Sequence, residues 1–214
     1  MMARVGKCGV VKLKVNCPDD ADRIAYLRES LGSGIRLRLD ANGEMNFQSA
    51  LELLMRASAA DVESFEEPLD RESDTLDAEL TELNSKTGVP LVADESVCTA
   101  KDVRRFADLK AYQIVNLRVG KCGGVIGTQS VLQAARSAGF GIVCGTMVGE
   151  TAVLLRVSRE LLARLEGIDY VEGLDQASNL LIEQTVLPVT ATDRHFELNK
   201  DSLDKYLISK QTFC

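Results

Sequence analysis

Strand-like and helix-like segments alternate along almost the whole chain, and this alternation restricts the fold more than any other feature of the sequence. Short apolar or alternating runs predict strands, and longer segments with helical periodicity follow them. The expected strands are 10–15, 35–40, 62–66, 91–94, 112–119, 141–144 and 170–173, and the expected helices are 19–31, 47–59, 73–86, 100–107, 128–138 and 151–165. Repeated strand–helix units with short connections predict a parallel sheet.

The number and regularity of these units favour a sheet that curls over one that stays open. Seven strands with helices between them fit a (β/α) barrel better than a doubly wound sheet. A Gly-x-Gly-x-x-Gly motif does not follow the first strand, which disfavours a dinucleotide-binding fold. We therefore expect an α/β barrel domain over residues 1–186 and an irregular extension over residues 187–214 that wraps the outside.

Composition excludes several classes of protein. A net charge of −7 and the absence of Trp argue against a nucleic-acid binder. No apolar run approaches the ~20 residues that span a membrane, and the N-terminus lacks the apolar core of a signal peptide. The six cysteines are scattered, as in a cytoplasmic protein with reduced thiols. His195 is the only histidine, which disfavours a zinc site or a Ser-His-Asp mechanism.

Three acidic residues, Asp40, Glu66 and Asp94, each end a predicted strand. They stand 26 and 28 residues apart (66 − 40 and 94 − 66), which is about one strand–helix unit per step. In a β/α barrel they would therefore point into one mouth from consecutive strands. Three converging carboxylates repel one another unless a cation lies between them. Hard oxygen ligands of this kind predict a site for Mg²⁺ or Mn²⁺.

Basic residues are expected on both sides of these acids. Lys12 and Lys14 share one face of the first strand, and Arg118 ends the fifth. This set suits proton abstraction next to the carboxylate of a small substrate, because a metal there stabilises the enolate that forms. A neighbouring cation favours the neutral amine, so Lys14 could act as base near neutral pH, with Lys12 as its electrostatic neighbour.

Four motifs in this order and spacing resemble the barrel domain of the enolase superfamily: Lys-x-Lys, Asp-x-Asn, Glu-Glu-Pro and Ala-Asp-Glu-Ser. Within it they are most similar to the muconate-lactonizing subgroup, which includes muconate cycloisomerases, dipeptide epimerases and o-succinylbenzoate synthases. The resemblance covers roughly residues 8–185. It implies a (β/α)7β TIM-like barrel in which Asp40, Glu66 and Asp94 bind Mg²⁺ and Lys14 is the acid/base.

The resemblance also implies roles for the residues around the ligands. Lys12 and Asn42 would support Lys14, and Glu95 would lie just behind the metal ligands. The segment 145–150, which ends at Glu150, resembles the loop that faces the substrate. Glu67 is expected to be structural and to point away from Glu66.

Arg118 stands where the subgroup usually has lysine. Arginine stays protonated and is a poor base. Cycloisomerisation is therefore favoured, and an elimination with one base, like that of o-succinylbenzoate synthase, is the first alternative. Epimerisation needs a second base, which would have to be Lys121 or a residue brought to the site by a shifted strand register. Arg118 would then hold the enolate or a substrate carboxylate; the alternative is an ion pair with Asp94 or Glu95.

The N-terminus departs from the resemblance as well. Members of the family carry a capping domain and a first barrel strand before Lys-x-Lys, and we expect this chain to lack both. A barrel without its first strand has an open edge, which favours a homo-oligomer or a partner that completes the barrel. An inactive barrel fragment with a structural or assembly role is the remaining alternative.

Overall fold

The computed structural model describes residues 9–147, 150 and 152–172, and it confirms the alternation of strands and helices. All neighbouring strands pair in parallel in one sheet of order β1-β2-β3-β4-β5-β6-β7. The strands are β1 (Val10–Lys14), β2 (Arg36–Asp40), β3 (Val62–Glu66), β4 (Leu91–Ala93), β5 (Ile114–Leu117), β6 (Gly141–Cys144) and β7 (Tyr170–Val171). The helices are α2 (Asp20–Leu31), α3 (Phe47–Arg56), α4 (Leu76–Thr87), α5 (Ala100–Leu109), α6 (Val125–Ser137) and α7 (Ala152–Arg164), with a short 3₁₀ turn, η1 (Ser58–Ala60).

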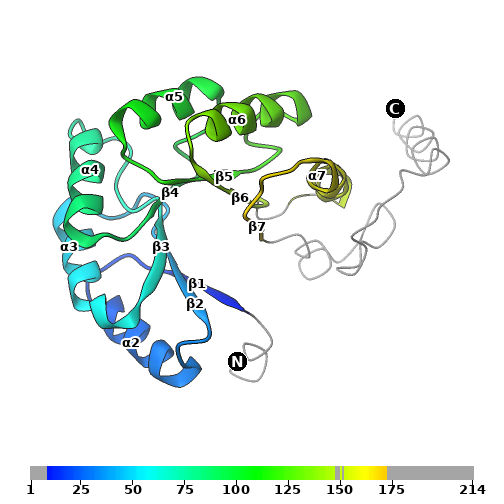
Figure 1. Cartoon of the computed structure of the whole chain (residues 1–214). Helices are drawn as coiled ribbons and strands as arrows, with labels where there is room; N and C mark the ends of the chain where they lie inside the picture. Colours follow the sequence, from blue (N-terminus) through cyan, green and yellow to red (C-terminus); the bar gives the residue numbers. More distant parts are fainter. Residues whose placement is uncertain (1–8, 148–149, 151, 173–214) are drawn as a thin grey trace, which may run out of the picture.

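The sheet curls into an arc, and the helices cover its convex outer side (Figure 1). Side chains that alternate along each strand therefore separate into two environments. The outward set packs against the helices as the apolar core and includes Leu37, Leu39, Phe65, Leu91 and Leu117. The inward set is rich in polar and charged side chains, so it forms a site rather than a second core.

The described strands do not close into a complete barrel by backbone pairing. The sheet ends at β1 on one side and at β7 on the other. Inside the arc, Lys12 Nζ lies 3.1 Å from Glu172 Oε1, and the Arg38 guanidinium lies 3.2 Å from the centre of the Tyr170 ring. Side chains thus join the two ends of the arc where backbone hydrogen bonds do not. The complete (β/α)7β barrel and the boundaries of its domain stay predictions, and residues 187–214 lie outside the described part.

Local sequence signals explain most helix boundaries. Asn46 caps α3, since its side chain accepts a hydrogen bond of 2.9 Å from the Ser49 N–H. The helix after the glycine pair begins at Val125 rather than at 128. Gly123 and Gly124 take φ values of 77° and 89°, so they complete the turn within two residues and the helix starts at once.

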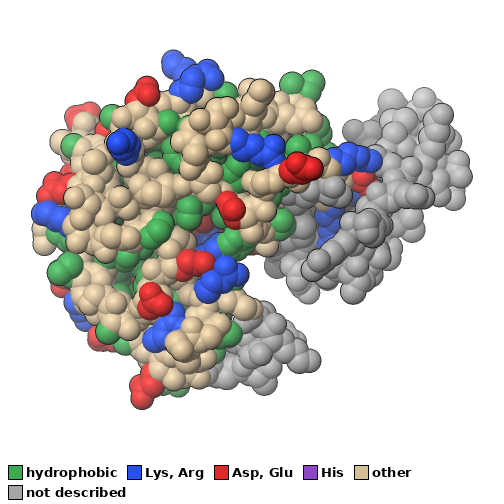
Figure 2. All heavy atoms as spheres, viewed as in Figure 1, with side chains coloured by type: hydrophobic (Ala, Val, Ile, Leu, Met, Phe, Trp, Pro, Cys, Tyr) green, Lys and Arg blue, Asp and Glu red, His purple; other side chains and the backbone are tan. Residues whose placement is uncertain are grey.

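Charges of both signs are interspersed on the described part of the face in Figure 2, which shows no single large basic area. Within residues 9–147, 150 and 152–172, no helix is long and apolar enough to cross a lipid bilayer.

Candidate active site

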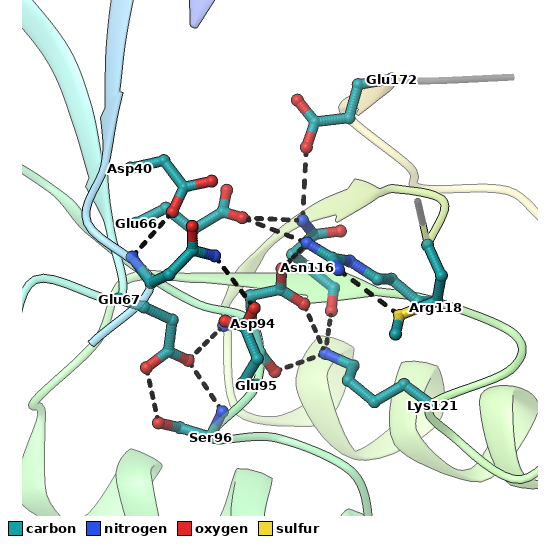
Figure 3. Close-up of polar contacts among 12 residues, drawn as sticks. Asp40, Glu66, Glu67, Asp94, Glu95, Ser96, Asn116, Arg118, Lys121 and Glu172 are labelled. Atoms are coloured by element: carbon teal, nitrogen blue, oxygen red, sulfur yellow. Dashed lines mark hydrogen bonds and ion pairs between the residues drawn. The ribbon is translucent and has the colours of Figure 1, made fainter. Parts of the chain in front are cut away.

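The three acids come together at the carboxyl ends of three adjacent strands (Figure 3). Asp40 and Glu66 end β2 and β3 and are direct register partners, and Asp94 follows the last residue of β4. All three are buried, with at most 5% of their surface exposed. The strand-end rule therefore predicted their placement correctly.

Lys12 lies between two of these acids. Its Nζ donates to Glu66 Oε2 at 2.7 Å and lies 3.2 Å from Asp40 Oδ2. It also reaches Glu172 Oε1 at 3.1 Å. Burial alone would lower the pKa of Lys12, but the charges of Glu66, Glu172 and Asp40 outweigh burial and raise it. Lys12 is therefore held as a cation between these carboxylates.

Lys14 stands at the rim. Its Nζ lies 2.7 Å from Asp40 Oδ2 and also contacts Asn42 Oδ1. Asn42 in turn donates from Nδ2 to Glu95 Oε1 at 3.1 Å, so it connects Lys14 with the loop after β4. A cavity of about 250 Å³ opens beside Lys14 and is lined in part by Asn16, Arg23 and Glu44.

Arg118 faces the site from the opposite side, directly after β5. Its Nη2 contacts Asp94 Oδ2 and lies 3.6 Å from Glu66 Oε1, so the ion pair with Asp94 that was the alternative to substrate binding is present. Glu66 is thus held between Lys12 and Arg118. Burial raises the pKa of Glu66, and the negative charge of Asp40 acts in the same direction while Lys12 opposes it. The Nη1 of Arg118 lies 3.4 Å from Met147 Sδ.

Lys121 lies behind Asp94, away from the open mouth. Its Nζ donates to Asp94 Oδ1 at 2.9 Å, to the Asn116 carbonyl at 2.8 Å and to the Asp94 carbonyl. All three ammonium donors are therefore in use. Burial lowers the pKa of Lys121, with a smaller contribution from the charge of Arg118. Lys121 thus connects Asp94 to the backbone of β5.

Glu67 points away from Glu66 and is fully buried, in agreement with the structural role expected for it. Its Oε1 accepts the backbone N–H groups of Asp94 at 2.7 Å and Ser96 at 2.8 Å, and its Oε2 accepts Ser96 Oγ at 2.7 Å. Burial raises the pKa of Glu67 to about 7, although the bonds from Ser96 act in the opposite direction.

Two residues in the site were not predicted from the sequence. Asn116 Nδ2 donates to Glu66 Oε1 and to Glu172 Oε1, at 3.3 Å in each case. Glu172 directly follows β7, so the strand-end rule that found Asp40 would also have found Glu172. Asn116 lies two residues before Arg118 on the same inward face, which was the available signal for it.

Glu150 lies beside the site. Its Oε1 accepts the Met147 N–H at 2.8 Å, and burial raises the pKa of Glu150. The neighbouring residues 148, 149 and 151 lie outside the described part of the chain.

The donor chemistry of the three acids fits a divalent ion, because hard carboxylate oxygens are what Mg²⁺ prefers. In the described residues, however, no three acidic, cysteine or histidine side chains stand close enough to share one ion. Lys12 joins Asp40 to Glu66, and Arg118 joins Glu66 to Asp94. These two cations occupy the oxygens that an ion would take.

Comparison with known proteins places the chain in a family. The family model described as enolase C-terminal domain-like matches residues 1–201. An L-Ala-D/L-amino acid epimerase from Pedosphaera parvula is 36% identical over 174 residues, which is 80% of this chain and 47% of the relative. An o-succinylbenzoate synthase from Thermobifida fusca is 32% identical over 172 residues, which is 78% of this chain and 51% of the relative.

Similar solved structures come from the same family as these relatives. The structure of muconate cycloisomerase from Pseudomonas fluorescens matches with a TM-score of 0.79 and 25% identity, over 92% of this chain and 55% of that chain. The structure of dipeptide epimerase from Enterococcus faecalis matches with a TM-score of 0.77 and 26% identity, over 87% and 53%. The chain spans about half the length of the curated relatives that it matches. It belongs to the enolase superfamily, in the subgroup that contains the muconate-lactonizing enzymes.

Proposed function

We propose that this chain carries the catalytic site of a Mg²⁺-dependent enzyme that forms or protonates an enolate next to a carboxylate, with one base. The reaction we favour is a cycloisomerisation of the muconate type. Asp40, Glu66 and Asp94 would hold the ion, which when bound supplies positive charge to the substrate carboxylate.

The exposure of the four cations is the observation that carries the proposal. The side chain of Lys14 is 66% exposed, against 24% for Lys12, 13% for Arg118 and 7% for Lys121. Lys14 is therefore the cation of this set that a substrate can reach most directly. The side chains of the other three are mostly buried against the acids, so they act as fixed charges. One accessible amine supports chemistry with one base.

Each residue of the site has a separate role in the proposed reaction. Lys14 Nζ takes the proton from the carbon next to the carboxylate, or returns it. Asn42 and Asp40 hold the Lys14 amine in place through their contacts with it. Lys12 and Arg118 stay charged on either side of Glu66 and limit the repulsion among the acids. Arg118 is also placed to attract a negatively charged substrate group.

A dehydration like that of o-succinylbenzoate synthase is the first alternative, because it also needs one base and a relative of that name is 32% identical. Dipeptide epimerisation is the second, supported by the 36% identical epimerase. The three occupied donors of Lys121 argue against epimerisation, since they leave no free second amine on the face of Arg118.

Among the described strands, β1 and β7 are the two edges of the sheet, and this supports a further part of the proposal. An unpaired parallel edge favours the addition of another strand. We propose that a second copy or a partner completes the barrel beside β1. Light scattering coupled to size exclusion tests this part, and a strictly monomeric protein with full activity would contradict it.

The first test of the function measures Mg²⁺ binding by calorimetry and turnover of muconate and of alanine-containing dipeptides in the same preparation. We expect Mg²⁺-dependent turnover that Lys14→Ala abolishes and Lys14→Arg does not restore, because arginine is a poor base. A chain that binds Mg²⁺ without turnover would instead favour a barrel fragment with a structural or assembly role. A chain that binds no Mg²⁺ would overturn the proposal.

A further inference from the structure

The backbone of Asp94 lies between two buried side chains, one acidic and one basic. On one side, Glu67 Oε1 accepts the Asp94 N–H at 2.7 Å. On the other, Lys121 Nζ donates to the Asp94 carbonyl and, at 2.9 Å, to Asp94 Oδ1. The N–H thus points at a carboxyl group and the carbonyl at an ammonium group, and a hydrogen bond from a charged donor is stronger than a neutral one. Figure 3 shows the two side chains approaching Asp94 from different sides.

Strand pairing does not provide this support, because β4 ends one residue before Asp94. The backbone bond that the Asp94 carbonyl accepts, from the Val97 N–H at 3.0 Å, comes from within the same loop. The ladder between β3 and β4 stops at Glu66 and Val92, and that between β4 and β5 stops at Ala93 and Val115. Glu67 has a φ of 38°, and its carbonyl accepts the N–H of Gly43 at 2.7 Å. The Asp94 N–H therefore donates to the side chain of Glu67 and not to the Glu67 carbonyl.

The same two side chains fasten the rest of the loop to its neighbours. Glu67, from the end of β3, also accepts the Ser96 N–H at 2.8 Å and Ser96 Oγ at 2.7 Å. Lys121, from the turn after β5, also donates to the Asn116 carbonyl at 2.8 Å. The loop after β4 is therefore held from β3 and from β5. Neither side chain has a part in the proton transfer proposed above.

We propose that Glu67 and Lys121 are positioning residues that fix Asp94 at the mouth. The inference rests on the proposed function for the metal-binding role of Asp94, but the contacts themselves can be tested without any metal. Partners that orient a metal ligand typically change metal affinity by about 10- to 100-fold when they are removed. Each of the two residues should therefore affect metal binding without touching the ion.

Substitutions at Glu67 separate hydrogen bonding from shape. Glu67→Gln keeps an oxygen that can accept both backbone N–H groups, and its amide can donate to the hydroxyl of Ser96. Glu67→Leu has a similar size and no acceptor. By amide hydrogen exchange, we expect protection of the Asp94 and Ser96 amides to fall about tenfold or more in Glu67→Leu, and to stay within about threefold in Glu67→Gln. The amides of β2 provide the internal control.

Lys121→Met tests the contribution of Lys121 independently of any change at Glu67. It should reduce protection at the Asp94 amide, because Lys121 holds the carbonyl and the carboxylate of the same residue. The Ser96 amide, whose residue Lys121 does not contact in the described structure, should stay within about threefold of wild type. If Glu67→Leu does not fold, this variant together with Glu67→Gln still decides the question. Unchanged protection of Asp94 in Lys121→Met, or its loss in Glu67→Gln, would overturn the inference.

Calorimetry with Mg²⁺ then tests whether these hydrogen bonds to Asp94 affect metal binding. Glu67→Leu and Lys121→Met should bind Mg²⁺ about 10- to 100-fold more weakly, while Glu67→Gln should stay near wild type. Leu53→Ala, a core truncation in α3, controls for general loss of stability and should leave Mg²⁺ affinity within about twofold. A wild-type protein without Mg²⁺ binding would refute the proposed function, and the exchange data would still decide whether Glu67 and Lys121 hold Asp94.

Discussion

At the scale of single residues, Arg118 is the residue on which the proposed one-base chemistry depends most. Its guanidinium contacts Asp94 and lies near Glu66, so it fills the place opposite Lys14 with a permanent charge. A lysine at this position could lose its proton, whereas arginine keeps its own across the physiological range. The difference between one base and two therefore depends on one side chain.

Arg118→Lys should give the site a second amine. In deuterium oxide, we expect wild type to exchange the α-proton of a substrate with retention of configuration, and Arg118→Lys to gain exchange with inversion. NMR follows the exchange, and chiral chromatography follows the configuration. Arg118→Gln is the matched control, since it removes the charge without adding a base. Inversion by the wild-type enzyme would show that a base other than Lys14 already acts.

Glu67 should make stability depend on pH in a direction opposite to that of most acids. Burial raises the pKa of Glu67 to about 7, while the ordinary pKa of a glutamate carboxyl is 4.5. The folded protein therefore keeps this proton over a pH range in which the unfolded chain has lost it, so the contribution of Glu67 is present below about pH 4.5 and is lost as pH rises to about 7. Across this pH range, wild type should lose on the order of 3 kcal/mol in free energy of unfolding relative to Glu67→Gln. Urea unfolding at several pH values measures it, and a flat difference would show that Glu67 is ionised throughout.

At the scale of elements, α5 begins with a complete capping box. Thr99 accepts the Asp102 N–H, and Asp102 accepts the Thr99 N–H at 2.8 Å. We expect Thr99→Ala to lower the free energy of unfolding by about 1 kcal/mol, because it leaves an N–H at the helix start without its partner. Thr99→Ser keeps the hydroxyl and should cost much less. Thermal unfolding followed by circular dichroism compares the three proteins, and equal losses for Ala and Ser would point to the methyl group of Thr99 instead of the cap.

The sequence predicts the elements better than it predicts the contacts inside the arc. Alternation and capping residues are local, so the seven strands and the cap at Asn46 follow from short stretches of sequence. The strand-end rule also brings Asp40, Glu66 and Asp94 together correctly. Which cation pairs with which acid depends on how far the sheet curls, and no local pattern encodes that curvature. Glu172 is the clearest case, because its contact with Lys12 joins residues 160 positions apart.

At the scale of the whole molecule, the two ends of the arc are joined by side chains. The strand β7 has two residues and pairs only with β6 among the described strands. From β7, the Tyr170 ring packs on the Arg38 guanidinium at 3.2 Å, and the neighbouring Glu172 reaches Lys12. Arg38 is buried, and burial lowers its pKa although Glu63 opposes the change. A buried guanidinium gains from an aromatic face, with about 2 kcal/mol expected for a desolvated pair.

Tyr170 should therefore stabilise the molecule through its ring and not through its hydroxyl. Tyr170→Ala removes the ring from Arg38 and leaves a cavity, so we expect the free energy of unfolding to fall by about 3 kcal/mol. The Tyr170 hydroxyl is buried and has no hydrogen-bond partner in the described structure, so Tyr170→Phe should leave stability unchanged or raise it slightly. Urea unfolding followed by circular dichroism measures both variants. A large loss in Tyr170→Phe would mean that the hydroxyl has a partner in solution, whereas a small loss in Tyr170→Ala would mean that the ends of the arc are held together mainly by Lys12 and Glu172.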